Sequence, residues 1–277
     1  MNYSYISGRY TMINIKFFLV LSGMFVMLSC SQFNQDQEKY GLCVPARMVM
    51  LQSDSLELPY SVRFNRKGKI DYIETHNFDG TFRSREDYHY NTEGQLKEVI
   101  GLNSDGEIEI RYVYDFDGNF IRECRIYGMN NQEMYRWIHS NDGKHIVHTE
   151  YLNEGELQCI ISKSFNGDSY VEESRTPEGV LIGRAEVDFL DSENKPRHIR
   201  GTDVDIEIEY DDKGLPTVSR NAVLNSTGSM EWVSELENNP LRYYSYEFDR
   251  RGNWVTRTER VHPDSSACAV LHRKIKY

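Results

Sequence analysis

The chain has 277 residues, of which 39% are hydrophobic and 27% are charged, and its formal net charge is −11. This length is sufficient for one domain with its own core. The acidic surplus repels polyanions, so neither nucleic acid nor anionic lipid headgroups are expected as partners.

Residues 1–29 are predicted to be a secretory signal peptide. Lys16 precedes an apolar run that continues to Leu28. A short basic region followed by about 7–15 apolar residues is typical of a signal that is removed after export, and such a run is too short to span a membrane well.

The end of this run, Met27-Leu28-Ser29-Cys30, resembles the bacterial lipobox. The resemblance implies cleavage before Cys30 and lipidation of its thiol. Methionine at the first position departs from the usual leucine, and an ordinary signal peptide with an incidental cysteine is the alternative. Residues 30–57 would then supply the lipidated cysteine, a polar tether and a lead-in segment. Removal of residues 1–29 leaves 30 basic and 43 acidic residues, a net charge of −13.

Beyond this segment, a glycine recurs at intervals of about twelve residues. The regular positions are Gly68, Gly80, Gly94, Gly106, Gly118, Gly143, Gly155, Gly167 and Gly179, and less even ones follow at Gly214, Gly228 and Gly252. A fixed short period indicates one small structural unit repeated many times.

The residues around these glycines predict β-hairpins. Asn or Asp often stands three positions before the glycine, as at Asn91 and Asp115. Such a side chain favours the start of a type I turn, and the glycine takes the left-handed position that closes a three-residue loop with a bulge. Position four before each glycine should then pair with position two after it. The predicted pairs are Phe64–Ile70, His76–Phe82, Tyr90–Leu96, Leu102–Ile108, Tyr114–Phe120, Tyr151–Leu157 and Phe248–Trp254.

Residues 58–277 are therefore predicted to form an all-β repeat domain, an antiparallel meander of tandem strand–turn units of about twelve residues. Side chains alternate with period two and not 3.6, and no convincing amphipathic helix is found. Seventeen or so strands exceed the roughly ten that a twisted open sheet holds. We expect the sheet to roll around its apolar face or to twist superhelically; two packed sheets are the alternative.

Two strings resemble the YD repeat of the RHS family, namely residues 112–119 and 244–253. The whole chain also resembles small repeat-bearing lipoproteins of Bacteroides-type bacteria. The resemblance implies strand–turn–strand architecture and an extracytoplasmic role. Long family members build hollow β-shells around a toxin. This chain has no appended toxin domain and is expected to have too few repeats to close a shell.

Three tyrosines are candidate ligand contacts, because strand parity places Tyr127, Tyr170 and Tyr243 on the outward face. Exposed aromatic rings on a sheet can stack on sugars or grip a protein. Isolated surface tyrosines without a ligand are the alternative. Trp137 and Trp254 fall on the inward parity and are expected in the core.

No metal site or cofactor is expected. His139, His145 and His148 flank one turn, but strand parity points His145 inward and His148 outward. The sequence also contains no nucleophile elbow, zinc-protease pair or phosphate loop.

Four cysteines besides Cys30, namely Cys43, Cys124, Cys159 and Cys268, allow three disulfide pairings. Buried free thiols are the alternative for Cys124 and Cys159, which both fall on the inward parity.

These features predict an outer-membrane lipoprotein on either face of that membrane, held there by its lipid anchor alone. It would act as a non-enzymatic binding or structural module for an envelope protein or a glycan. The alternatives are a hydrolase of envelope polymers and an accessory or neutralising protein for a secreted toxin.

Overall fold

The computed structural model describes residues 42, 44, 46–53, 59–190, 195–201, 205–220, 222–224, 230–232, 241–261 and 269–277. All regular elements in these ranges are β-strands. Within the same ranges, no helix is present that is long and apolar enough to cross a membrane.

The described residues contain twenty strands in succession. They are β1 (Met48–Ser53), β2 (Tyr60–Phe64), β3 (Ile70–His76), β4 (Phe82–Tyr90), β5 (Leu96–Leu102), β6 (Ile108–Asp117), β7 (Phe120–Gly128), β8 (Glu133–Asn141), β9 (Ile146–Asn153), β10 (Glu156–Asn166), β11 (Ser169–Arg175), β12 (Leu181–Leu190), β13 (Lys195–Gly201), β14 (Asp205–Tyr210), β15 (Pro216–Arg220), β16 (Ala222–Leu224), β17 (Met230–Trp232), β18 (Arg242–Phe248), β19 (Trp254–Arg260) and β20 (Ala269–Lys276).

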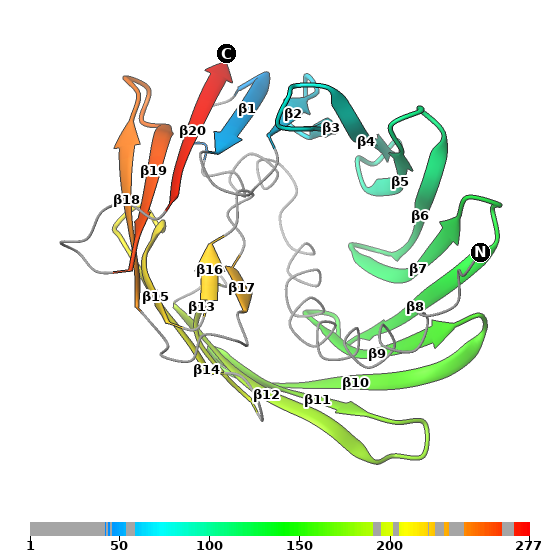
Figure 1. Cartoon of the computed structure of the whole chain (residues 1–277). Coiled ribbons are helices and arrows are strands. Elements are labelled where there is room, and N and C mark those ends of the chain that lie inside the picture. The colour runs from blue at the N-terminus through cyan, green and yellow to red at the C-terminus, as the bar shows by residue number, and fades with distance from the viewer. Residues whose placement is uncertain are drawn as a thin grey trace, which may run out of the picture.

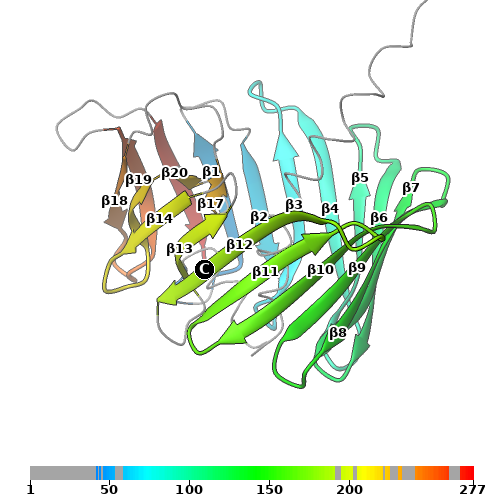
Figure 2. The ribbon, with the colours of Figure 1, turned by 90° about the horizontal axis from the view of Figure 1, so that it is seen from below.

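Eighteen of these strands form a closed antiparallel barrel. Each strand from β1 to β15 pairs with the next, β15 then pairs with β18, and β18, β19 and β20 follow in order. The ring closes because β20 pairs with β1 over six residues, from Met48 opposite Lys276 to Ser53 opposite Leu271. Figures 1 and 2 show this ring along its axis and from below. β16 and β17 form a separate two-stranded sheet.

The predicted all-β antiparallel meander is confirmed. The sheet does not twist into a superhelix, and the alternative of two packed sheets is also wrong. The repeats were expected to be too few to close a shell, but the sheet closes into a barrel. Closure depends on β1, which lies in the lead-in segment before the first repeat glycine and offers both of its edges to the sheet. A closed barrel leaves no unpaired strand edge, which is the main liability of a long open sheet.

The turn chemistry explains most of the hairpins. Five predicted cross-strand pairs are confirmed: Phe64–Ile70, His76–Phe82, Tyr90–Leu96, Leu102–Ile108 and Phe248–Trp254. In a representative turn, the amide of Gln95 donates to Asn91 Oδ1 at 2.8 Å. Gly94 has a φ of +86°, the left-handed conformation that the loop requires.

Two predicted pairs are wrong because their loops contain two residues instead of three. Asp117 pairs directly with Phe120, and Asn153 pairs directly with Glu156. The same short loop occurs after β10, where Asn166 pairs with Ser169. After β10 the register is unbroken, so the lost loop residue moves the side chains of β11 to the opposite face. In the other two hairpins a bulge restores the predicted parity, and Tyr114 pairs with Cys124 and Tyr151 with Cys159.

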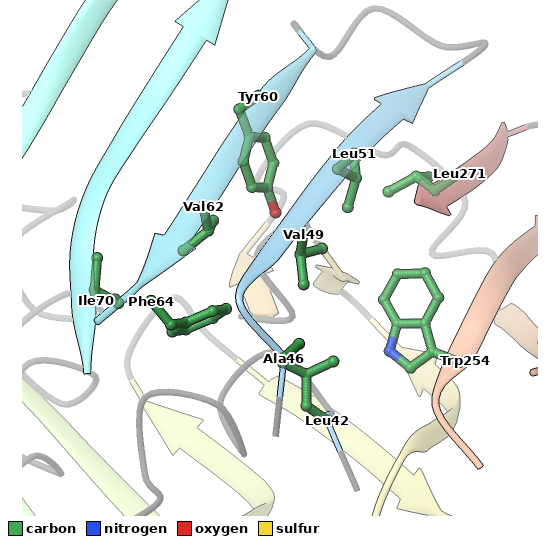
Figure 3. Packing of buried hydrophobic residues seen from close by; sticks show 10 residues of the cluster. All are labelled: Leu42, Ala46, Val49, Leu51, Tyr60, Val62, Phe64, Ile70, Trp254 and Leu271. Carbon is green, nitrogen blue, oxygen red and sulfur yellow. The ribbon is translucent and has the colours of Figure 1, made fainter. Parts of the chain in front are cut away.

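The inner face of the barrel carries the buried side chains. The register joins Val49 to Val62 and Val62 to Ile73 on one face, and the largest apolar cluster lies there. Figure 3 shows this cluster around β1; its members are Leu42, Ala46, Val49, Leu51, Tyr60, Val62, Phe64, Ile70, Trp254 and Leu271. A smaller cluster of Ile206, Ile208 and Tyr244 lies on β14 and β18. Both clusters therefore lie on or near the side of the barrel that contains the seam.

Candidate functional site

A row of large aromatic side chains covers the inner face on another side of the barrel. We call the set formed by Tyr112, Tyr114, Tyr135, Trp137 and Tyr151 the inner aromatic wall; it lies on β6, β8 and β9. None of the five belongs to either apolar cluster, and all five are only partly buried. Part of each of these side chains is therefore exposed to solvent.

The strand register brings the rings of the wall together. Tyr112 pairs with Ile126, which pairs with Tyr135. One step along the strands, Cys124 lies between Tyr114 and Trp137, and Trp137 pairs with Tyr151. The rings of Tyr135 and Tyr151 stack with centroids 5.8 Å apart and planes inclined by 21°. Cross-strand aromatic contacts of this kind hold the rings in fixed orientations.

Three hydroxyl groups of the wall, those of Tyr112, Tyr114 and Tyr151, are protonated at neutral pH. Burial raises the pKa values of Tyr112, Tyr114 and Tyr151 above that of a free tyrosine. A protonated hydroxyl can donate a hydrogen bond to a ligand oxygen, but the hydroxyl of Tyr114 already interacts with the Cys124 thiol. Burial likewise raises the pKa of the Cys124 thiol to about 12, so this cysteine is not a thiolate nucleophile. The wall combines apolar ring faces with hydrogen-bond donors and has no reactive group.

A buried polar group continues the inner face onto β8–β11. Lys163 Nζ lies 3.0 Å from Glu172 Oε2, with side chains only 4% and 2% exposed. The same ammonium lies 4.9 Å from the centre of the Tyr170 ring. Because the two charges neutralise each other inside the barrel, this pair is a structural feature of the inner face.

His139 and Thr149 form a second polar contact in this region. His139 Nδ1 lies 2.8 Å from Thr149 Oγ1, and both residues are buried. Burial, with a smaller contribution from the positive charge of Lys163, lowers the pKa of His139 to about 4. The imidazole is therefore neutral at neutral pH.

The three tyrosines predicted as ligand contacts do not form one site. Tyr127 and Tyr243 lie on the outer face as expected, and Tyr127 lies under the guanidinium of Arg111, 4.7 Å from its carbon. Their strands, β7 and β18, are opposite one another, with eight strands between them in either direction. The expected exposure of Tyr170 is wrong. It is 6% exposed and pairs with Phe165 on the inner face, because the loop before it contains two residues.

The other residues singled out in the sequence are separated or lie outside the described residues. His139 and His145 lie on the inner side, where His145 stacks on Phe165, whereas His148 lies on the outer face beside Glu150. Within the described ranges, no three His, Cys, Asp or Glu side chains are grouped as metal ligands.

The cysteines and tryptophans follow the inward parity where the structure describes them. Cys124 and Cys159 are buried free thiols, and Trp254 is buried in the main cluster. Cys30, Cys43 and Cys268 lie outside the described residues.

The outer face is charged and ordered by ion pairs between neighbouring strands. They include Arg85–Glu74, Arg111–Glu98, Arg136–Glu123, Arg200–Asp188 and Arg220–Glu207, with N–O distances of 2.6–3.6 Å. These side chains are partly exposed, so each pair contributes little stability. Their regular arrangement makes the outer face strongly polar.

Comparison with known proteins identifies no family. No family model matches the chain, and no curated protein matches it. Among solved structures, it is similar to a porin-like protein from Bacteroides uniformis, with 10% identity, a TM-score of 0.40 and coverage of 84% of this chain and 98% of that one.

A porin-like protein from Bacteroides vulgatus gives 9% identity, a TM-score of 0.37 and coverage of 84% and 99%. A chain of the TcdB2-TccC3-Cdc42 structure gives 10% identity and a TM-score of 0.21, with 78% of this chain and 16% of that chain covered. Similarities at this level assign neither family nor activity.

Proposed function

We propose that this protein is a non-enzymatic binding module of the cell envelope that holds a glycan against the inner aromatic wall. The observation that carries the proposal is the set of five partly exposed rings on β6, β8 and β9, none of which belongs to an apolar cluster. Flat rings offer stacking surfaces for sugar rings, and the protonated tyrosine hydroxyls offer donors for sugar oxygens.

The non-enzymatic part of the proposal is supported by the state of the polar groups beside the wall. Lys163 and Glu172 form a buried pair, and His139 is neutral and in contact with Thr149. A general acid or base works best with a pKa near the operating pH, and the pKa of His139 is about 4. A hydrolase acting on envelope polymers is therefore less well supported than a binding protein.

The proposal places the outer face in water. A strand that faces lipid carries apolar side chains on that face, and an Arg or Lys at the bilayer midplane costs about 2–4 kcal/mol. The outer face of this barrel instead carries cross-strand ion pairs on β3–β8 and β12–β15. Attachment to the membrane is accordingly assigned to a lipid on Cys30 and not to the strands.

The anchor makes a direct prediction. Cys30→Ala is expected to abolish incorporation of labelled palmitate into the protein, because the lipidated thiol is removed. Cys43→Ala, which removes a cysteine 13 positions downstream, is the matched control and should be labelled like the unaltered protein. The measurement is metabolic labelling followed by immunoprecipitation. Equal labelling of both variants would mean that Cys30 is an incidental cysteine.

The wall makes a second prediction. A glycan that binds the mature protein on an array is expected to bind Tyr112→Ala and Tyr151→Ala roughly 3–10-fold more weakly by calorimetry. Each substitution removes one aromatic contact worth about 0.5–1.5 kcal/mol. Tyr127→Ala, the same change on the outer face of β7, should leave the affinity unchanged. Thermal melts would verify that all three variants are folded.

Two results would count against the wall as the site. One is weaker glycan binding for Tyr127→Ala alone. The other is the absence of any glycan ligand together with one envelope protein that is captured through the outer face, which would favour the protein-binding alternative.

A further inference from the structure

A hollow of about 680 Å³ lies on the outside of the barrel at the seam where β1 meets β2 and β20. Its lining comes from the ends of these strands and from the turn after β2: Arg47, Met48, Arg63, Phe64, Asn65, Arg66, Asp71, Lys276 and Tyr277. It is separate from the inner aromatic wall, and the proposed glycan function does not use it.

The lining is strongly basic although the chain as a whole is acidic. Four of its side chains are cationic, whereas Asp71 is the anionic side chain, lying 3.6 Å from Arg63. The other three lining cations form no ion pair with a carboxylate of the described residues; they are Arg47, Arg66 and Lys276. Several arginines elsewhere on the outer face are paired, as Arg111 is with Glu98.

The backbone fixes the positions of these cations. Met48 pairs with Arg63 on one side and with Lys276 on the other, so the two cations flank one residue across three strands. Neighbouring strands are about 4.8 Å apart, which places the two chain positions about 10 Å from each other. The Arg47 amide donates to the Lys276 carbonyl at 2.7 Å, and the Phe64 amide donates to the Arg47 carbonyl at 2.9 Å. Arg47 therefore lies between Arg63 and Lys276, on a backbone segment that is hydrogen-bonded to the strands on both sides.

We propose that this seam pocket binds a phosphate-bearing ligand. Guanidinium and ammonium groups give charge-assisted hydrogen bonds to phosphate oxygens, and the planar fork of arginine matches two oxygens at once. The four cationic side chains are all exposed, so a ligand can reach them without rearrangement of the strands. A hollow of about 680 Å³ also has room for the group that carries the phosphate. A phosphorylated sugar and a phospholipid headgroup share this chemistry.

The test uses the mature protein with two phosphate probes and two neutral controls. Glucose 1-phosphate and glucose are titrated by calorimetry, and vesicles of phosphatidylcholine with and without phosphatidylglycerol are used in co-sedimentation. We expect binding of glucose 1-phosphate but not of glucose, weakened by added salt because the contacts are exposed charges. If the protein sediments only with the vesicles that contain phosphatidylglycerol, the result would support the pocket and indicate that its ligand is a lipid headgroup.

Variants locate the binding. Arg63→Gln and Arg66→Gln should each weaken binding of the phosphate probe roughly tenfold, the effect of losing one charge-assisted contact. Lys67→Gln removes the same charge from the neighbouring exposed residue, which does not line the hollow, and should leave binding nearly unchanged. Because Arg66 lies exposed in a turn, its loss should not unfold the sheet.

The proposal is overturned if neither phosphate probe binds, or if glucose binds as well as its phosphate. The proposal would also be overturned if Arg66→Gln and Lys67→Gln weakened binding of the phosphate probe equally. The probe would then be attracted by the general positive charge of this surface and not bound in the hollow. Binding of glucose would also bear on the inner aromatic wall, whose variants lie on the other face of the sheet and would show whether the sugar binds there. The other two results do not bear on the wall.

Discussion

Lys163→Met is expected to lower the free energy of unfolding by about 3–5 kcal/mol, the cost of breaking a buried ion pair by removing one partner. The substitution leaves the Glu172 carboxylate, which is 2% exposed, without the ammonium that lies 3.0 Å away. It also removes the contact between that ammonium and the Tyr170 ring. Urea unfolding followed by far-ultraviolet circular dichroism would measure the loss.

The double variant Lys163→Met/Glu172→Met separates lost charge pairing from lost packing. Replacing both members of a buried pair by apolar side chains of similar volume is often neutral or stabilising. We therefore expect the double variant to recover most of the stability lost by the single variant. A double variant less stable than Lys163→Met would contradict this account of the inner face.

A second large effect is expected from pH through His139. Its pKa in the folded protein is about 4, against 6.5 for an unperturbed histidine, so the unfolded chain binds more protons between these values. The resulting stability is fully present above pH 6.5 and decreases as the pH falls towards 4. The total loss is about 3 kcal/mol, at about 1.4 kcal/mol for each pH unit.

His139→Gln isolates this contribution, because carboxylates also titrate in the lower part of the range. Glutamine cannot take up the proton but can keep a hydrogen bond to Thr149. The difference in unfolding free energy between the unaltered protein and the variant should therefore shrink steadily from pH 6.5 to pH 4. If the unfolding free energies of the two proteins changed in parallel with pH, folding would not lower the pKa of His139 and this account would be contradicted.

Local turn chemistry made most of the fold predictable from the sequence. An Asx residue three positions before a glycine defines a loop closed by a left-handed glycine, and the turns at Gly94 and Gly252 have this form. Asn131, with a φ of +57°, fills the left-handed position where the glycine period has a gap. The sequence therefore predicted the hairpins and the all-β class.

The faces of individual strands were harder to predict because single residues change the parity. Lys97 is the bulged residue between Leu96 and Glu98, so Val99 faces inward and Ile100 outward, opposite to strict alternation from Gly94. The two-residue loop at Gly167-Asp168 placed Tyr170 inside. Glycine at the first loop position, as at Gly118 and Gly167, is typical of one form of that shorter turn, whereas the loop Glu154-Gly155 has its glycine second.

Closure and the candidate sites depend on contacts between residues far apart in sequence. β1 carries no repeat glycine, yet its pairing with β20 closes the ring. Tyr112, Tyr114 and Trp137 already follow the inward parity in the sequence, but parity alone does not reveal that apolar clusters form elsewhere. Net charge is similarly limited, since it predicts repulsion of anions and cannot reveal that Arg47, Arg63 and Lys276 meet at one seam.

The most direct test of the proposed function is photo-cross-linking in cells from one inner and one outer position. p-Benzoylphenylalanine would replace Tyr112 in one strain and Tyr127 in another, and the products would be digested with protease and probed for attached sugar. A protease-resistant glycan adduct at position 112, absent at position 127, is the predicted result. Adducts formed at position 127 alone, or a protein adduct at position 112, would contradict a glycan held against the inner aromatic wall.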